Sequence, residues 1–118
     1  MKTVRVILSE EAEEVYKFLN SEAPHSKIER TILNALKKKV ELIKSNPHYG
    51  EPISKKFIPK KYVDDYGVTN LFWVKLPNFW RMIYTLTSGE SVVEIIAFVI
   101  DIFDHKKYPL ECEAYFFS

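Results

Sequence analysis

The sequence predicts an α+β fold, in which an N-terminal strand and a helical hairpin pack on a mainly antiparallel four-stranded sheet. Two observations predict this class. Apolar residues recur at helical spacing between residues 10 and 45, whereas residues 71 to 100 form three β-rich stretches separated by short turns. Helices grouped ahead of strands are typical of α+β domains, where the helices cover one sheet face. The expected element order is therefore β-α-α-β-β-β.

Length and composition indicate one cytoplasmic domain. The 118 residues, 47% of them hydrophobic and 28% charged, are enough for a single domain over 1–118 with its own core. The net charge is +1, although lysines concentrate within residues 52–81. The one cysteine, Cys112, is typical of a reducing compartment, and the glutamates on either side of it disfavour a reactive thiolate. We expect no signal peptide, and the longest apolar run, near residues 91–100, is too short to span a membrane.

The first half of the chain predicts one strand and two helices. Residues 3–8 are short and β-branched, which favours a strand. Ser9 precedes several glutamates, the pattern of a helix start, and this helix should run to about Glu22. Ser26 can cap a second amphipathic helix. The "NPHYG" stretch at 46–50 ends it, because the residue before a proline is disfavoured in a helix.

The second half predicts a loop followed by a meander. Residues 51–70 are irregular, and we expect a packed loop with one short helical turn after Pro59. "DHKKY" at 104–108 should form a C-terminal turn or short helix. The antiparallel strands are expected at residues 71–76, 79–87 and 91–100.

Arg81 is a cation within an otherwise apolar strand, "NFWRMIYTL". Strand alternation points its side chain to one face of the sheet, and the opposite face receives one expected core set: Trp80, Met82, Tyr84 and Leu86. If Lys75 on the preceding strand shares its face, two cations lie together, and such a pair favours phosphate or carboxylate binding. Two structural alternatives stay open, because Arg81 could extend past the turn to solvent or pair with Glu94.

Other polar residues add candidates. His105 could act as a general base beside neighbouring lysines. The histidines are far apart, no Cys or His spacing indicates a metal site, and no Gly-rich phosphate loop occurs, so neither a metal nor a cofactor is expected. Two Lys-Lys pairs are either solvated charge or an RNA contact: Lys55 and Lys56, and Lys60 and Lys61.

Two motifs, "LFWVKLPNFWRMIYTL" and "VIDIFDHKKY", together with the element order, resemble the RelE/ParE toxin superfamily of bacterial and archaeal type II toxin-antitoxin systems. The resemblance implies a RelE-like toxin that cleaves mRNA at the ribosome without a metal, through attack of a 2′-OH on the adjacent phosphate. It further implies that Arg81 and Lys75 stabilise the phosphate, that Tyr108 orients or stacks on a base, and that His105 serves as acid or base.

The resemblance also implies partners and one alternative. A cognate antitoxin, a peptide or protein, would cover the Lys-Lys pairs and the lysine face of the second helix. RelE carries an arginine just after its last strand, where Ile102 aligns here between Asp101 and Asp104, and the 51–70 segment is longer than the family's loop. The alternative is therefore a catalytically inactive RelE/ParE-fold protein, directed at gyrase or at an antitoxin-like partner. A third possibility is a non-toxin domain whose charges are structural.

Overall fold

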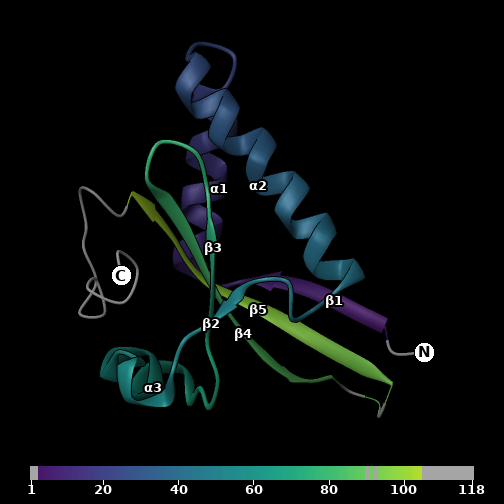
Figure 1. Ribbon diagram of the computed structural model, residues 1–118. Helices are drawn as coiled ribbons and strands as arrows, with labels where there is room; N and C mark the ends of the chain where they lie inside the picture. The colour runs from purple at the N-terminus through teal and green to yellow at the C-terminus, as the bar shows by residue number, and fades with distance from the viewer. Residues whose placement is uncertain (1–2, 90, 92, 105–118) are drawn as a thin grey trace.

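The computed structural model describes residues 3–89, 91 and 93–104, and it confirms the α+β class. Three α-helices, one 3-10 helix and a five-stranded sheet make up this part of the chain (Figure 1). The elements are β1 (Thr3–Leu8), α1 (Glu10–Glu22), α2 (Lys27–Ser45), β2 (Glu51–Pro52), η1 (Lys55–Phe57), α3 (Lys60–Tyr66), β3 (Phe72–Lys75), β4 (Trp80–Ser88) and β5 (Glu94–Asp104).

The sheet has the strand order β1-β5-β4-β3-β2. β1 runs parallel to β5, and the other neighbours are antiparallel. The prediction of four strands was wrong, because Glu51 and Pro52 pair with Trp73 and Phe72 to add a short fifth strand. Proline can occupy this place because an edge strand does not need every backbone N–H for pairing.

The helical hairpin covers one face of the sheet, as predicted. Ser9 caps α1, since its Oγ accepts a hydrogen bond from the Ala12 N–H at 3.0 Å. The same hydroxyl donates to the Ile100 carbonyl at 2.6 Å, which joins the start of α1 to β5. The largest buried side chains between this hairpin and the sheet are Leu19, Ile32, Leu36, Ile43, Met82, Tyr84, Val99 and Ile102.

The other face of the sheet is covered by residues 51–70, including α3, which Figure 1 shows well apart from α1 and α2. The predicted helical turn after Pro59 is α3, seven residues long, and it ends where Gly67 adopts a φ of 62°. A second core lies on this face, which we call the α3 face. Its buried members are Ile53, Tyr62, Val68, Leu71, Ile83, Ile100 and Phe103.

The strand parity expected for β4 is confirmed. Met82 and Tyr84 belong to the core beneath the helical hairpin, whereas Ile83 belongs to the core of the α3 face. β5 continues to Asp104, beyond the end predicted at residue 100, so Asp104 lies in a strand and not in the expected turn. No helix within the described part of the chain is long and apolar enough to cross a membrane.

Candidate nucleic-acid interface

The β3–β4 hairpin places Lys75 directly opposite Arg81, so the two side chains share a face, which was the condition for a cation pair. The hairpin closes through a four-residue turn in which the Trp80 N–H donates to the Pro77 carbonyl at 3.2 Å. Lys75 is exposed, whereas Arg81 is only 3% exposed. Two cations of different exposure therefore lie side by side near the tip of this hairpin.

Arg81 is held by groups that carry no full negative charge. Its Nη1 donates to the Trp80 carbonyl at 2.9 Å, and its Cζ lies 5.4 Å from the centre of the Trp73 ring. Within the described chain, its buried Nε has no hydrogen-bond acceptor and its guanidinium has no carboxylate within ion-pair distance. Burial lowers the pKa of Arg81 from its usual value, because removal from water disfavours the charged form.

Both structural alternatives for Arg81 are wrong. Phe103 is its neighbour on β5, whereas Glu94 lies at the opposite end of that strand. The Glu94 carboxylate lies 3.8 Å from the Nε of Arg5 instead. Extension to solvent does not occur either, since Arg81 is almost fully buried. An internal charge without a described acidic partner is unusual in a folded domain.

A β-bulge brings a carboxylate onto the same face. Ile83 pairs with Asp101 and Tyr84 pairs with Val99, so Ile100 is an extra residue on β5. Asp101 thereby faces α3, where its Oδ2 accepts a hydrogen bond from the Tyr62 hydroxyl at 2.9 Å. Burial raises the pKa of Asp101, while the Tyr62 hydrogen bond and the positive charge of Lys61 oppose that rise.

Ile102, which aligns with an arginine of the RelE family, does not lie on the sheet face that holds Arg81. Ile102 is 1% exposed and packs in the core beneath the helical hairpin. A side chain at this position therefore points away from the α3 face, which holds Arg81. Arg81 has two β5 neighbours on its own face. Phe103 lies directly opposite Arg81, and Asp101 lies opposite Ile83, two residues further along β4.

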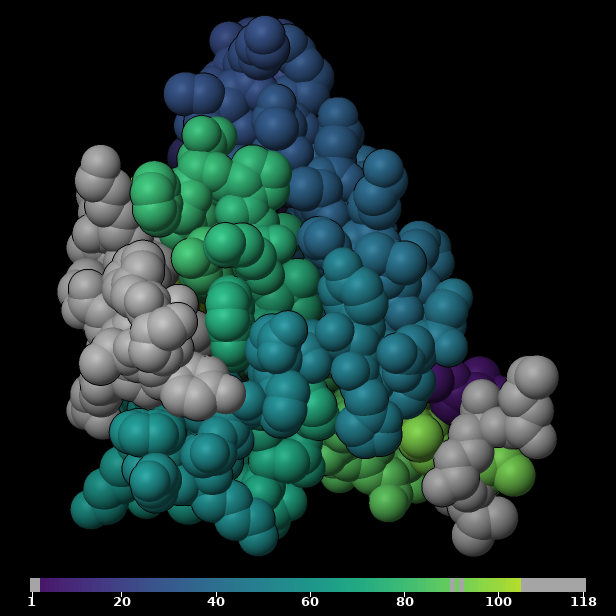
Figure 2. All heavy atoms as spheres, in the orientation of Figure 1, coloured from purple at the N-terminus to yellow at the C-terminus, as the bar shows by residue number. Residues whose placement is uncertain are grey.

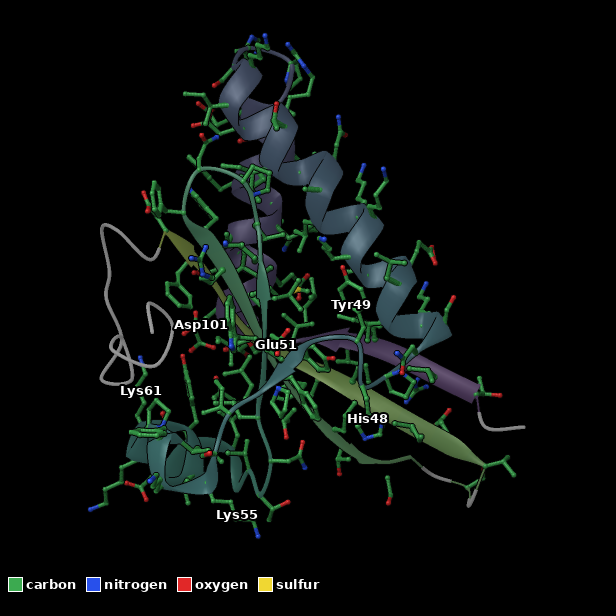
Figure 3. The ribbon with its side chains drawn as sticks, viewed as in Figure 1. His48, Tyr49, Glu51, Lys55, Lys61 and Asp101 are labelled. Carbon is green, nitrogen blue, oxygen red and sulfur yellow. The ribbon has the colours of Figure 1, made fainter. Side chains whose placement is uncertain are left out.

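A hollow of about 670 Å³ lies at the sheet edge, where Lys75 of the cation pair lines it and Arg81 does not. β2 pairs with only Phe72 and Trp73 of β3, so the rest of the β3 edge is left open to this hollow. Figure 3 shows Tyr49 between α2 and β2, the edge strand that carries Glu51. The Lys39 Nζ donates to the Tyr49 hydroxyl at 3.0 Å. The lining residues are Lys39, Tyr49, Gly50, Glu51, Trp73, Val74 and Lys75.

The four lysines predicted to contact RNA are all exposed, but they do not form one cluster with Arg81. Lys55 lies below α3 in Figure 3, at the end of the molecule opposite the β3–β4 turn. Lys56 packs over the Phe57 ring, with 5.2 Å from its Nζ to the ring centre. Lys60 begins α3, and Lys61 is the one whose charge acts on Asp101.

Two predicted catalytic residues, His105 and Tyr108, lie outside the described residues, as does Cys112. Within residues 3–104, apart from 90 and 92, no group of three or more metal-binding side chains occurs. Sequence reasoning missed the Tyr62–Asp101 pair and the participation of Lys39, Tyr49 and Glu51. No local pattern signals either of them, because each joins elements distant in the chain.

Comparison of the chain with models of protein families, with curated proteins and with solved structures found no match.

Proposed function

We propose that this protein is the toxin of a type II toxin-antitoxin system and that it acts on mRNA at the ribosome as a RelE-like endoribonuclease. The motif resemblance supplies the class. The observation that carries the proposal is the juxtaposition of Arg81 and Lys75, two cations without a described carboxylate partner. Such a pair is the electrostatic arrangement that a phosphate group complements.

The two cations have different parts in this proposal. Lys75 is exposed and would attract the RNA backbone from solvent. Arg81 is buried against Trp73, so water screens its charge little when a phosphate is held next to it at Lys75. An anion therefore interacts more strongly with a desolvated cation than with a solvated one. The hydrogen bond to the Trp80 carbonyl orients the guanidinium in advance.

The reaction needs three kinds of group. The 2′-oxygen attacks phosphorus and the bond to the 5′-oxygen breaks, giving a 2′,3′-cyclic phosphate and a free 5′-OH. A base takes the proton of the 2′-OH, and an acid protonates the leaving oxygen. Arg81 and Lys75 would stabilise the charge that builds on the phosphate oxygens. The resemblance assigns acid or base work to His105 and base stacking to Tyr108.

The acidic residues nearby are compatible with RNA binding. Asp101 receives the Tyr62 hydrogen bond, and its raised pKa reduces the free-energy cost of neutralising it. Asp104 has interactions of its own within the structure. A carboxylate that is already hydrogen-bonded repels a phosphate less than an unpaired one would.

The test is mRNA cleavage on translating ribosomes, with the ends of the message mapped. We expect cuts with the wild-type protein and a loss of about 100-fold or more in cleavage rate for Arg81→Met and for Lys75→Met. The matched control is Lys17→Met, because Lys17 is an exposed α1 lysine whose charge is already paired with Glu13 at 3.5 Å. Undiminished cutting by Arg81→Met would show that the site is wrong.

Thermal unfolding separates a lost site from a lost fold. Arg81→Met replaces a buried cation by an apolar side chain of similar length, which is often neutral or stabilising. We therefore expect its unfolding midpoint to lie at or above that of the wild type. A variant that loses both cleavage and stability would show instead that Arg81 has a structural role.

A catalytically inactive RelE/ParE-fold protein is the second candidate. It is favoured by the absence of a third cation among the β5 residues flanking Arg81, which are Phe103 and Asp101. No cleavage by the wild-type protein, together with inhibition in a gyrase supercoiling assay, would select this candidate.

We also propose a cognate antitoxin as partner, whose acidic segment would lie on the exposed lysines of α2 and of residues 55–61. α2 presents Lys37, Lys38 and Lys44 to solvent. Co-purification with the product of the neighbouring gene tests this. We expect Lys37→Glu with Lys38→Glu to weaken the complex, and Lys17→Glu to leave it intact.

A further inference from the structure

The hollow at the sheet edge is lined by charges of both signs. Glu51 pairs with Trp73 across β2 and β3, and Lys75 lies two residues further along β3, so Glu51 and Lys75 project from the same face. Diagonal neighbours of this kind lie about 7–8 Å apart. Within the described chain, neither residue belongs to an ion pair. An exposed acid and an exposed base therefore line one hollow without neutralising each other.

The α2 side of the hollow adds an aromatic ring and a second cation. Tyr49 is 37% exposed and belongs to neither core. The Lys39 Nζ donates to the Tyr49 hydroxyl and lies 5.4 Å from the centre of the ring, which restrains the ring beside the hollow. The segment that joins α2 to β2 is at the surface in the space-filling view (Figure 2). A ligand can therefore reach this ring from solvent.

This combination of groups restricts the class of ligand. Glu51 would repel an acidic peptide, whereas Lys39 and Lys75 would repel a basic one. A nucleotide suits both signs, because its phosphate is an anion and its base carries N–H donors. Proteins recognise unpaired RNA bases by stacking them on aromatic rings and by hydrogen bonds to the Watson–Crick edge. The volume of about 670 Å³ is within the usual range of ligand pockets.

The Glu51 carboxylate favours one base. A carboxylate presents two acceptor oxygens side by side and binds best where two donors lie side by side. Guanine offers this arrangement, because its N1–H and its N2 amino group are adjacent on the Watson–Crick edge. Adenine and cytosine each place a ring-nitrogen acceptor beside the amino donor, and uracil places a carbonyl oxygen on either side of its N3–H. An acceptor facing a carboxylate is repelled, so guanine is the base that complements Glu51.

We propose that the hollow is a guanine-selective subsite for single-stranded RNA. The Glu51 carboxylate accepts hydrogen bonds from N1–H and N2–H of the base, Tyr49 stacks on the base, and Lys39 and Lys75 attract the adjoining phosphates. The proposal rests on the RNA-binding function proposed above and adds the base that is selected.

The test compares affinities for short single-stranded RNAs that are all uridine except for one central guanosine or adenosine, measured by fluorescence anisotropy. We expect the wild type to bind the guanosine RNA about tenfold more tightly, as one bidentate base contact allows. Glu51→Gln should bring the ratio of the two affinities to about one, because an amide offers one acceptor and one donor in place of two acceptors. Lys75→Met should weaken both RNAs equally, because a phosphate contact carries no base preference.

The matched control is Glu41→Gln, since Glu41 pairs with Lys44 at 3.8 Å and does not line the hollow. This variant should keep the guanine preference. Glu51 is exposed on an edge strand of two residues, so the unfolding midpoint of Glu51→Gln should equal that of the wild type. A change in base preference at an unchanged midpoint therefore reports on the subsite and not on the fold.

The outcomes separate this proposal from the one on which it rests. Equal affinity of the wild type for the two RNAs, with binding weakened in Lys75→Met, would overturn the guanine subsite alone. A guanine preference that persists in Glu51→Gln would overturn the role of Glu51. Guanine-selective binding without cleavage of mRNA on ribosomes would overturn the nuclease function and support the subsite. Absence of RNA binding by the wild type would overturn both proposals.

Discussion

Tyr84 connects the turn after α2 to the middle of the sheet, and its removal provides a quantitative test of the fold. The residue is fully buried in β4, where its ring stacks on Phe72 with 5.2 Å between ring centres. Its hydroxyl donates to the Pro47 carbonyl at 2.7 Å and accepts from the Gly50 N–H at 2.9 Å. These bonds position the segment that carries Tyr49 and Glu51 along the hollow beside Lys75.

Tyr84→Phe removes one oxygen atom and leaves the ring in place. The Gly50 N–H is buried and would lose its acceptor, and the Pro47 carbonyl would lose its donor. A buried polar group left without a partner costs about 1–3 kcal/mol, so we expect a loss of about 2 kcal/mol in the free energy of unfolding. With about 2.1 cal/mol/K of unfolding entropy per residue, this lowers the midpoint of a 118-residue chain by about 8 °C.

Thermal unfolding followed by circular dichroism measures this effect, with Tyr16→Phe as the matched control. No hydrogen bond from the Tyr16 hydroxyl occurs within the described residues, so its removal should shift the midpoint little. A Tyr84→Phe midpoint within 2 °C of the wild type, well inside the expected shift, would refute the reasoning. The difference between the unfolding midpoints of the wild type and Tyr84→Phe should also become smaller above about pH 10, where tyrosines of the unfolded chain ionise. Burial raises the pKa of Tyr84, so the wild type loses there a contribution to stability that Tyr84→Phe does not have.

Two further substitutions test the same region and the α3 face. Because burial raises the pKa of Asp101, its protonated form favours the folded state, and this stability is lost as pH rises from about 4 through the folded pKa. Asp101→Asn should therefore unfold at a higher temperature than the wild type at pH 7 and at nearly the same temperature at pH 3; a lower midpoint at pH 7 would contradict this. Gly50→Ala should cost about 1–3 kcal/mol in denaturant unfolding, because the added Cβ would lie 2.9 Å from the Tyr84 Cε1 and 3.0 Å from the Trp73 carbonyl oxygen. An unchanged urea midpoint would contradict that crowding.

Much of the fold could be predicted because its signals are local. The Ser9 hydroxyl followed by acidic residues marks the start of α1, and Pro47 marks the end of α2 within one or two residues. β2 escaped prediction because two residues carry no periodicity and one of them is proline. The bulge at Ile100 escaped for a different reason, since nothing in an apolar run indicates which residue will lack a partner.

The candidate site, too, could be predicted only where its signals are local. Strand alternation was enough to place Arg81 away from Met82 and Tyr84, and hairpin pairing then put Lys75 beside it. The Trp73 ring under Arg81 could have been anticipated from the same alternation, but the depth of burial could not. The contact between Tyr62 and Asp101 depends on where α3 lies over the sheet, which is set by tertiary packing of residues 51–70.

Whether the protein lacks a cation beside Arg81 depends on the sheet face to which the side chain at position 102 points, and the alignment with a family arginine does not give that direction. An arginine at position 102 would project into the core beneath α1 and α2, so isoleucine there removes nothing from the Arg81 face. Because of the bulge, the β5 residues nearest Arg81 on that face are Ile100, Asp101 and Phe103, and Phe98 follows further along the strand. Positive charge additional to Lys75 and Arg81 must therefore come from another element, and Lys61 on α3 already acts on Asp101.

If Lys61→Met lowers the cleavage rate together with Arg81→Met while Lys55→Met does not, then α3 supplies the charge that β5 lacks. Equal effects of Lys61→Met and Lys55→Met would instead indicate general attraction of RNA by the basic segment, because Lys55 lies far from the hairpin.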